Sequence, residues 1–356
     1  MRKLCMCLFA CITLTSYAQL QNNEVWKLPE MGQGAVRQLI RIPDIQGYHT
    51  LKCDFHIHTV FSDGEVWPSA RVKEAWRQGL DAIAITDHIE YRPHKDQLSG
   101  DFNSADNIAR KTANDLGFIL IKGSEITRQK PLGHLNALFL TDSNPLDVKD
   151  PLQAIDIARS QGAVILWNHP GWPDNQSTIY PVHEQLLANH KIDMVEVHNY
   201  MEYYPLSFDW ITKYNIAPSA NSDTHNTIEN EFGTDRMLRP MTLVFAKDRS
   251  EAGIKEALLA RRTAALFNGN VMARQEWAEQ LFRSSIDYRI IRQSEGMVTL
   301  EVENRSDIPY TLKNSKNDLM VLPAQKAVIL NLIPGERLRV MNVFVGHNRN
   351  LEIPVE

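Results

Sequence analysis

His56 and His58 are the first residues whose types and spacing suggest metal chemistry. They lie two residues apart in a short apolar segment, and side chains two apart in an extended strand point to the same face. Both imidazoles can therefore reach one metal ion. Asp63 follows in the next loop, beside Gly64, which permits a tight turn. Taken alone, the pair is almost as well explained by two histidines that bond to backbone at a strand end.

Five further groups of metal-binding side chains occupy comparable positions. They are Asp87-His88 after the apolar run 82–86, Glu125 after 118–123, His134 before 135–140, His169 after 163–167, and Asp223-Thr224-His225 after 217–221. In barrels of parallel strands, functional residues collect at the carboxyl ends of the strands. Six such groups in series therefore predict one shared site.

The ligand types indicate what this site can do. Imidazoles with carboxylates suit Zn²⁺, Mn²⁺ or Fe²⁺, and the lack of thiolates argues against a purely structural zinc site. Metal ions about 3.5–4 Å apart can share a water molecule, lower its pKa and present hydroxide to phosphorus. They also bind the phosphate oxygens on which negative charge accumulates. Such hydrolysis needs no nucleophile from the protein, and Cys53 is expected to be a small apolar filler.

The elements that must position these side chains alternate along the chain. Strands are predicted at 51–56, 82–86, 118–123, 135–140, 163–167, 194–197, 217–221 and 241–245. Helices are predicted at 68–78, 105–116, 150–161 and 252–261; Pro68 begins the first, and Gly117 and Gly162 follow the second and third. Continuous apolar strands that alternate with helices indicate parallel pairing, and seven or eight such units suggest a closed or nearly closed barrel.

The pattern changes after about residue 280. Strands are predicted at 288–291, 297–302, 319–322, 327–332, 338–345 and 351–355, with turn-rich pieces and no helix between them. The predicted fold class is therefore α/β, with a hydrolase barrel at 51–275 and a small antiparallel β-sandwich-like domain at 280–356. The second domain has no cluster of histidines and acidic residues, so we expect a structural or docking module.

Residues 1–18 have the pattern of a cleaved secretory signal. A basic start at 1–3 precedes an apolar run over 4–14, and small residues lead to a cleavage point after Ala18. The run is too short to span a bilayer, and no later segment resembles a membrane span. We expect an exported protein, periplasmic or secreted, with 19–50 as an N-terminal arm. Lipid anchoring at Cys11 is the weaker alternative, since only seven residues separate it from the basic start.

The charge balance limits the partners. The formal net charge is −5 and no basic run occurs, whereas a protein that grips long nucleic acid usually has the opposite bias. The expected partner is a small phosphate ester, and neither long nucleic acid nor an integral membrane span is expected. The oligomeric state stays open.

From about Leu51 to Phe267 the chain resembles the PHP (polymerase and histidinol phosphatase) superfamily. The resemblance lies in ordered motifs, which are DFHIHT…SDG, ITDH, GSEIT, GHLN, WNHP and NSDTH. The sequence motifs VWP and HIEYRPHK resemble those of secreted bacterial phosphodiesterases that hydrolyse small organophosphate diesters. The resemblance implies a distorted seven-stranded (βα) barrel that holds two or three divalent metal ions.

The resemblance also implies a role for each ligand. His56, His58, Glu125 and Asp223 would bind a first metal ion. Glu125 would bridge to a second ion, which His134 and His169 complete. A third ion would be held by Asp63, His88 and His225. Catalysis would run through a hydroxide that bridges the metals, so His56, His58, Glu125, His169 and Asp223 are the residues expected to carry it.

Several neighbours are candidates for supporting roles. Asp87 is expected either to orient an imidazole or to cap the strand end, and Asn199 is a candidate for the pocket wall. Arg92, Lys95 and Arg128 are candidates for gripping a phosphate oxygen, although solvated surface charges explain them equally well. The histidines outside the motifs, which are His49, His183, His190, His198 and His347, are expected to be structural.

The leading hypothesis is hydrolysis of a small phosphate diester. The alternative is a phosphomonoesterase, because the same metals can serve either ester. A nuclease acting on long strands is disfavoured by the acidic balance. The non-enzymatic alternative is a surface protein that binds metal or glycan through its β-domain. The natural substrate and the metal identity stay open.

Overall fold

A computed structural model describes residues 36–233 and 239–355 of the protein. The predicted signal at 1–18, and residues 19–35 of the predicted arm, lie outside the described residues. Residues 37–356 group into one compact unit. In the described part of the chain, no helix has the length and apolar character that crossing a membrane requires.

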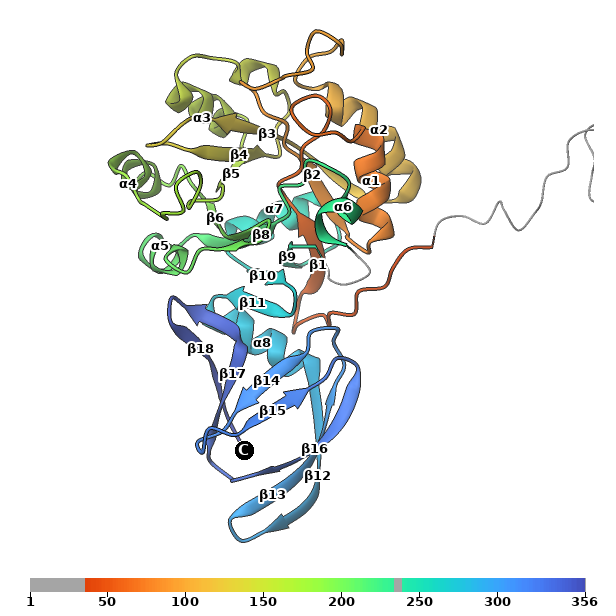
Figure 1. Cartoon of the computed structure of the whole chain (residues 1–356), viewed down its shortest axis with the longest axis vertical. Coiled ribbons are helices and arrows are strands. Elements are labelled where there is room, and N and C mark those ends of the chain that lie inside the picture. Colours follow the sequence, from red (N-terminus) through yellow and green to blue (C-terminus); the bar gives the residue numbers. More distant parts are fainter. Residues whose placement is uncertain (1–35, 234–238, 356) are drawn as a thin grey trace, which may run out of the picture. The chain divides into compact units, whose positions relative to one another are not determined.

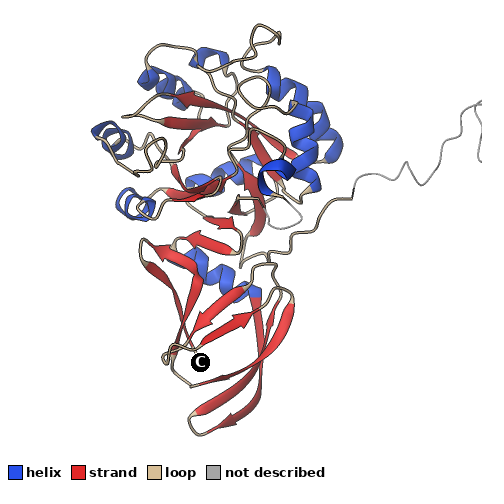
Figure 2. Ribbon diagram, in the orientation of Figure 1, coloured by secondary structure: helices blue, strands red, loops and turns tan. Residues whose placement is uncertain are grey.

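Strands and helices alternate through the first part of the chain, and strands alone follow α8 (Figures 1 and 2). The strands are β1 (His49–Asp54), β2 (Ala82–Ile85), β3 (Ile119–Thr127), β4 (His134–Leu138), β5 (Val164–Trp167), β6 (Met194–Asn199), β7 (Glu202–Tyr203), β8 (Ala217–Asn221), β9 (Met241–Ala246), β10 (Thr263–Phe267), β11 (Asn270–Ala273), β12 (Ile286–Ser294), β13 (Met297–Asn304), β14 (Tyr310–Lys313), β15 (Leu319–Leu322), β16 (Lys326–Leu332), β17 (Arg337–Gly346) and β18 (Arg349–Pro354). The helices are α1 (Pro68–Arg77), α2 (Ser104–Leu116), α3 (Pro151–Ser160), α4 (Pro181–Ala188), α5 (Ser207–Tyr214), α6 (Ile228–Phe232), α7 (Glu251–Leu259) and α8 (Gln275–Ser285), with a 3₁₀ turn, η2, at Asn144–Leu146.

The local signals read from the sequence account for the long helices. Helix α1 begins at Pro68, whose missing N–H would have no partner in a first turn, and it buries Val72 and Ala75. Helix α2 ends where Gly117 adopts φ 60°, a left-handed conformation that costs glycine little. Helices α4, α5, α6 and α8 were not predicted. Three of them span only five to eight residues, too few for a clear periodic pattern.

The strands that carry the site lie in the order β9-β1-β2-β3-β4-β5-β6, with β8 beside β6. The pairs β1–β2, β2–β3, β5–β6 and β6–β8 are parallel, so the fold is α/β as expected. The expectation of parallel pairing throughout is wrong for two strands. Strand β4 is antiparallel to β3 and β5, and β9 is antiparallel to β1. The short link between Thr127 and His134 explains β4, because a parallel crossover needs a dozen or more residues.

Side-chain hydroxyls link β8 to its other neighbours. The Thr242 hydroxyl of β9 accepts a hydrogen bond from the Ala220 amide at 3.1 Å, and the Thr263 hydroxyl of β10 donates to the Pro218 carbonyl at 2.7 Å. These contacts bring β8 towards β9 and β10, and so nearly close the ring of strands.

The strands after α8 fall into two groups. Strands β12, β13 and β16 form an antiparallel sheet, which agrees with the predicted change of pattern. Strands β14, β15, β17 and β18 instead continue the large sheet, because β17 pairs with β11 in parallel. The sequence pattern did not indicate this continuity, and neither β10 nor β11 was predicted.

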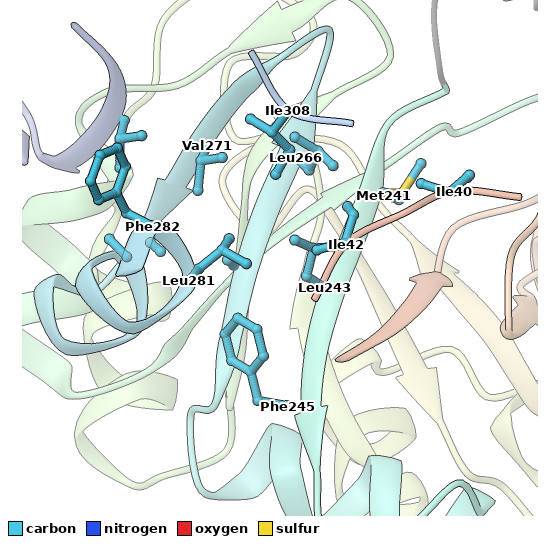
Figure 3. Packing of buried hydrophobic residues seen from close by; sticks show 14 of the residues in the cluster. Ile40, Ile42, Met241, Leu243, Phe245, Leu266, Val271, Leu281, Phe282 and Ile308 are labelled. Carbon is cyan, nitrogen blue, oxygen red and sulfur yellow. The ribbon is translucent and has the colours of Figure 1, made fainter. Parts of the chain in front are cut away.

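One apolar cluster joins the two parts of the chain. Figure 3 shows Leu243 and Phe245 of β9, Leu266 of β10 and Leu281 of α8 turned towards one another. The same cluster includes residues of the last strands, such as Val343. Burial of each such side chain contributes about 1.5–3 kcal/mol relative to exposure. The C-terminal strands therefore share a hydrophobic core with the strands that position the site.

Candidate metal centre

The nine predicted metal ligands come together at one end of these strands. His56, His58 and Asp63 follow β1, and His88 follows β2; Glu125 lies in β3, His169 follows β5, and Asp223 and His225 follow β8. His134 is the first residue of β4. Because β4 runs antiparallel to its neighbours, its beginning lies at the edge where the parallel strands end. The antiparallel direction is therefore what brings His134 into the site.

The ligand atoms form four overlapping groups in which all atoms lie within 4.8 Å of one another. These groups are His58, Asp63, His88 and His225; His56, His58 and Glu125; His56, His169 and Asp223; and Glu125, His134 and His169. These groups overlap the three sets of ligands that the family resemblance implied but do not coincide with them: His58 also joins Asp63, His88 and His225, and Asp223 lies with His56 and His169. The arrangement suits divalent metal ions, which this set of imidazoles and carboxylates is chemically able to bind.

Glu125 lies at the middle of the arrangement and is fully buried. One carboxylate oxygen, Oε2, is 3.2 Å from His56 Nε2 and 3.3 Å from His58 Nε2, and Oε1 is 2.7 Å from His134 Nδ1. Asp223 Oδ1 approaches the same two nitrogens, at 3.1 Å from His56 Nε2 and 3.0 Å from His58 Nε2. Two carboxylates thus converge on the Nε2 atoms of the imidazole pair.

Several polar atoms of this cluster are buried without a hydrogen-bond partner. They are His58 Nε2, Asp63 Oδ1, Glu125 Oε1 and His134 Nδ1. The short distance between His134 Nδ1 and Glu125 Oε1 is an ion-pair approach without hydrogen-bond geometry. Buried polar atoms are rarely left unsatisfied in proteins. Cations between these atoms would satisfy all four, so the residues fit a metal centre.

The charge states of the cluster suit the same role. Burial lowers the pKa of His169 to about 3, which leaves its imidazole neutral and able to donate a lone pair. Burial alone would raise the pKa of Glu125 and of Asp223, but the surrounding histidines, His56 prominent among them, hold both pKa values below the ordinary range. The site therefore presents ionised carboxylates beside at least one neutral imidazole.

Glu196 supports this cluster and was missed in the sequence. It is fully buried in β6, where Oε1 is 3.0 Å from His56 Nδ1 and Oε2 accepts a hydrogen bond from the His169 amide at 2.6 Å. The side-chain amides of Asn199 and Asn221 also donate hydrogen bonds to the Glu196 carboxylate, each at 2.9 Å. A carboxylate on the outer nitrogen of a metal-binding imidazole fixes its orientation. The available signal was an acidic residue inside an apolar strand.

Asp87 does not contact an imidazole directly. Its carboxylate accepts hydrogen bonds from the amide and the hydroxyl of Thr59, both at 2.6 Å, and from the Ser62 hydroxyl at 2.7 Å. The Ser62 hydroxyl lies 3.4 Å from His58 Nδ1. Of the two roles expected for Asp87, the capping role is the one that its contacts display, and any effect on His58 passes through Ser62.

Arg71 is a second supporting residue that the sequence analysis missed. It is buried in α1, and its guanidinium donates to the backbone carbonyls of His58, Thr224, His225 and Asn226 at 2.9, 3.2, 2.8 and 2.7 Å. Two loops that carry ligands are thus held by one side chain. A single arginine in a helix gives no local signal of this role.

None of the three predicted phosphate-gripping residues lines the cavity at the ligand cluster, although Arg128 lines a neighbouring cavity that Asp63, His88 and His134 also line. Arg92 donates to the carbonyls of Phe61 and Gly100, at 3.1 and 3.2 Å, and Lys95 is exposed. Arg128 pairs with Glu90 and donates to the carbonyls of Thr127 and Val148. Seven of the nine candidate ligands, all but His56 and His58, line a cavity of about 380 Å³, and none of the three cations is among the residues that line it.

The other walls of this cavity come from Trp172, Asn199, Tyr200, Glu202, Tyr204 and Glu231. Asn199 thus faces the cavity as anticipated, whereas the others were not singled out. His198 packs on Phe267, with ring centroids 4.3 Å apart, and His183 is buried beneath the loop before β4. Both lie outside the cavity lining, in agreement with a structural role.

Comparison with known proteins places this geometry in a family context. The model of the PHP domain matches residues 54–326. A crystal structure of a two-domain protein from Bacteroides vulgatus, which contains a predicted PHP-like metal-dependent phosphoesterase, is 39% identical and superposes with a TM-score of 0.87. The match covers 91% of this chain and 99% of that one.

Two uncharacterized proteins of Methanocaldococcus jannaschii match shorter stretches. One is 37% identical over 81 residues, which cover 23% of this chain and 36% of its own length. The other is 28% identical over 134 residues, which cover 35% of this chain and 70% of its own length. The chain thus spans little more than a third of the first of these relatives.

Proposed function

Because this chain belongs to the PHP domain family, we propose that it is a metal-dependent hydrolase of small phosphate diesters. The observation that carries the proposal is the cluster of nine histidine, aspartate and glutamate side chains with four buried atoms that lack hydrogen-bond partners. The similarity to a two-domain protein with a PHP-like phosphoesterase supports the hydrolase class. Resemblance of the HIEYRPHK segment to secreted phosphodiesterases supports the diester.

In hydrolysis, the metal ions and the residues of the site would have different roles. Divalent metal ions, when bound, supply a Lewis acid for the phosphate oxygens and lower the pKa of the attacking water. Glu125 and Asp223 both approach the Nε2 atoms of His56 and His58, and Glu196 fixes the outer nitrogen of His56. No residue that lines the metal cavity is a lysine or arginine. The charge of the cavity wall is therefore set by carboxylates and imidazoles.

This absence of cationic side chains favours a diester over a monoester. A phosphomonoester carries two negative charges near neutral pH, whereas a diester carries one, and the second charge usually needs further cations. Arg92 and Arg128 are occupied by backbone carbonyls and, for Arg128, by Glu90. Neither lines the metal cavity, and Arg128 lines only the neighbouring cavity.

We further propose that the protein acts outside the cytoplasm, in the periplasm or as a secreted enzyme. The secretory pattern at 1–18 supports this location. The formal net charge of −5 favours a small phosphate ester over long nucleic acid as the partner.

Metal analysis followed by a matched pair of substrates tests the proposal. Protein loaded with Zn²⁺, Mn²⁺ or Fe²⁺ should hydrolyse bis(4-nitrophenyl) phosphate at least tenfold faster than 4-nitrophenyl phosphate, which has the same leaving group. His169→Ala should abolish turnover, and His347→Ala, at a histidine outside the site, should not. Faster turnover of the monoester would favour a phosphatase, and no turnover of either ester would contradict the hydrolase.

A further inference from the structure

A second cavity of about 580 Å³ adjoins the metal cavity. The two share four lining residues, which are Asp63, His88, His134 and Trp172. Three of these are predicted metal ligands, so a group bound at the metals has direct access to the second cavity. We call the second cavity the side recess.

Two exposed aromatic side chains line the side recess. Tyr91, in the loop after β2, is 54% exposed, and Trp172, in the loop after β5, is 49% exposed. Each lies close to a ligand: Tyr91 is 6.1 Å from His88, and Trp172 is 4.9 Å from His134, between ring centroids. Exposed aromatic rings beside a polar site can stack on a planar group of a ligand, and each such aromatic contact contributes about 0.5–1.5 kcal/mol.

Arg128 and Glu90, two charged residues of the side recess, are already engaged with each other and with backbone groups. The Arg128 guanidinium is held by Glu90 and by the Thr127 carbonyl, and the Glu90 carboxylate also accepts the Thr127 amide at 2.8 Å. Lys149 is exposed in the lining. A planar, weakly polar group can cover the two rings without displacing these bonds.

We infer that the side recess binds an aromatic ester substituent of the substrate, with the ring against Tyr91 and Trp172 and the phosphorus at the metal ligands. The inference rests on the proposed function and narrows its substrate class to aryl or heteroaryl phosphate diesters. Tyr91 and Trp172 thereby become determinants of specificity, since they touch the substituent and not the reacting phosphorus.

Binding of two phosphonates with the same headgroup tests the inference without turnover. Phenylphosphonate and methylphosphonate are titrated calorimetrically into the metal-loaded protein. The phenyl compound should bind about tenfold more tightly, as expected for one or two added aromatic contacts. In Tyr91→Leu and in Trp172→Leu this preference should fall to about threefold or less, with metal content unchanged.

Two further variants make the result specific. Tyr91→Phe keeps the ring and should keep the preference. Tyr288→Ala removes a tyrosine of matched exposure, 55%, on β12 and should leave both affinities unchanged. Equal binding of the two phosphonates by the wild-type protein, or a preference that survives both leucine variants, would overturn the inference alone. Failure of both phosphonates to bind the metal-loaded protein would overturn the proposed function with it.

Discussion

Glu125 and Glu196 are both fully buried next to His56, yet they have different roles. Glu125 faces the inner nitrogen of His56 and also lies within 3.3 Å of His58 Nε2, among the atoms that would share metal ions. Glu196 faces the outer nitrogen and accepts the backbone amide of His169. Burial raises the pKa of Glu196, and the charge of His56 opposes that rise. One carboxylate is thus placed among the candidate ligands, and the other is placed to orient two of them.

Replacement of Glu196 by glutamine should therefore weaken metal binding without unfolding the protein. The variant keeps the side-chain volume but loses the charge and one acceptor oxygen, and loss of such a partner typically costs about 10- to 100-fold in metal affinity. Competition with a chelating dye measures the change. Glu276→Gln, at an exposed glutamate in α8, serves as the control. Unchanged metal affinity in Glu196→Gln would show that the carboxylate does not orient His56.

At the scale of elements, the loops that carry ligands are tied to neighbouring helices. Helix α4 supplies one tie through His183, whose Nε2 donates to the Leu132 carbonyl at 2.6 Å, two residues before His134. The Nδ1 atom of His183 accepts the backbone amide of Tyr180 at 3.1 Å and so closes the start of the helix. Burial lowers the pKa of His183 to about 4. The bond accepted by Nδ1 needs the neutral imidazole, whereas the bond that Nε2 donates to the Leu132 carbonyl persists in the protonated ring.

This tie predicts a pH dependence of stability. Because the pKa of His183 is lower in the folded chain than the ordinary value of about 6.5, the unfolded chain takes up a proton first as the pH falls. The free energy of unfolding should fall by about 1.4 kcal/mol per pH unit from this residue between pH 6.5 and 4, and no further below pH 4. Urea unfolding across this range measures how steeply the free energy of unfolding changes with pH. In His183→Gln this dependence should correspond to the uptake of one proton fewer on unfolding. Equal slopes in the two proteins would contradict the assignment.

At the scale of the whole molecule, the described strands after α8 complete the core of the strands before it. Strand β17 pairs with β11, and Val343 lies in the same apolar cluster as Leu266 and Leu281. A chain that ends at residue 275 would lose α8 and expose both the edge of β11 and this cluster. The predicted boundary between 275 and 280 therefore crosses a shared core.

Truncation after residue 275 should for this reason prevent cooperative folding. We expect a product that is insoluble, or soluble without a sharp urea transition, because buried apolar side chains contribute about 1.5–3 kcal/mol each and several would be exposed. Circular dichroism during urea unfolding gives the measurement, with the chain from residue 37 to 356 as the control. A truncated protein that unfolds sharply and binds metal would show that the barrel folds independently.

Metal removal should also lower the stability of the whole protein. Ions that bind only the folded chain add about 2.7 kcal/mol per site when their concentration is 100 times the dissociation constant. They also satisfy the four buried atoms that lack hydrogen-bond partners. Thermal unfolding with and without a chelator measures the difference. Asp223→Asn should show a smaller difference than the wild-type protein, and no chelator effect on the wild-type protein would argue against bound metal.

The nine candidate ligands, the α/β class and the later antiparallel strands could be predicted from the sequence because their signals are local. A histidine pair at strand spacing, a glycine after a helix or an apolar run needs only a few neighbouring residues to be visible. Which ions the ligands bind, and which ester the protein cuts, stay predictions.

The tertiary structure alone decided how these local signals combine. In the structure β4 runs antiparallel to β3, and Glu196 contacts His56 although 140 positions separate them in the chain. Arg92 donates to a backbone carbonyl, and β17 pairs with β11. Each of these depends on contacts between segments far apart in the chain, which neither composition nor periodicity encodes. His56 and His58 were therefore readable as a pair, while the residues that hold them in place became visible only when distant strands were brought together.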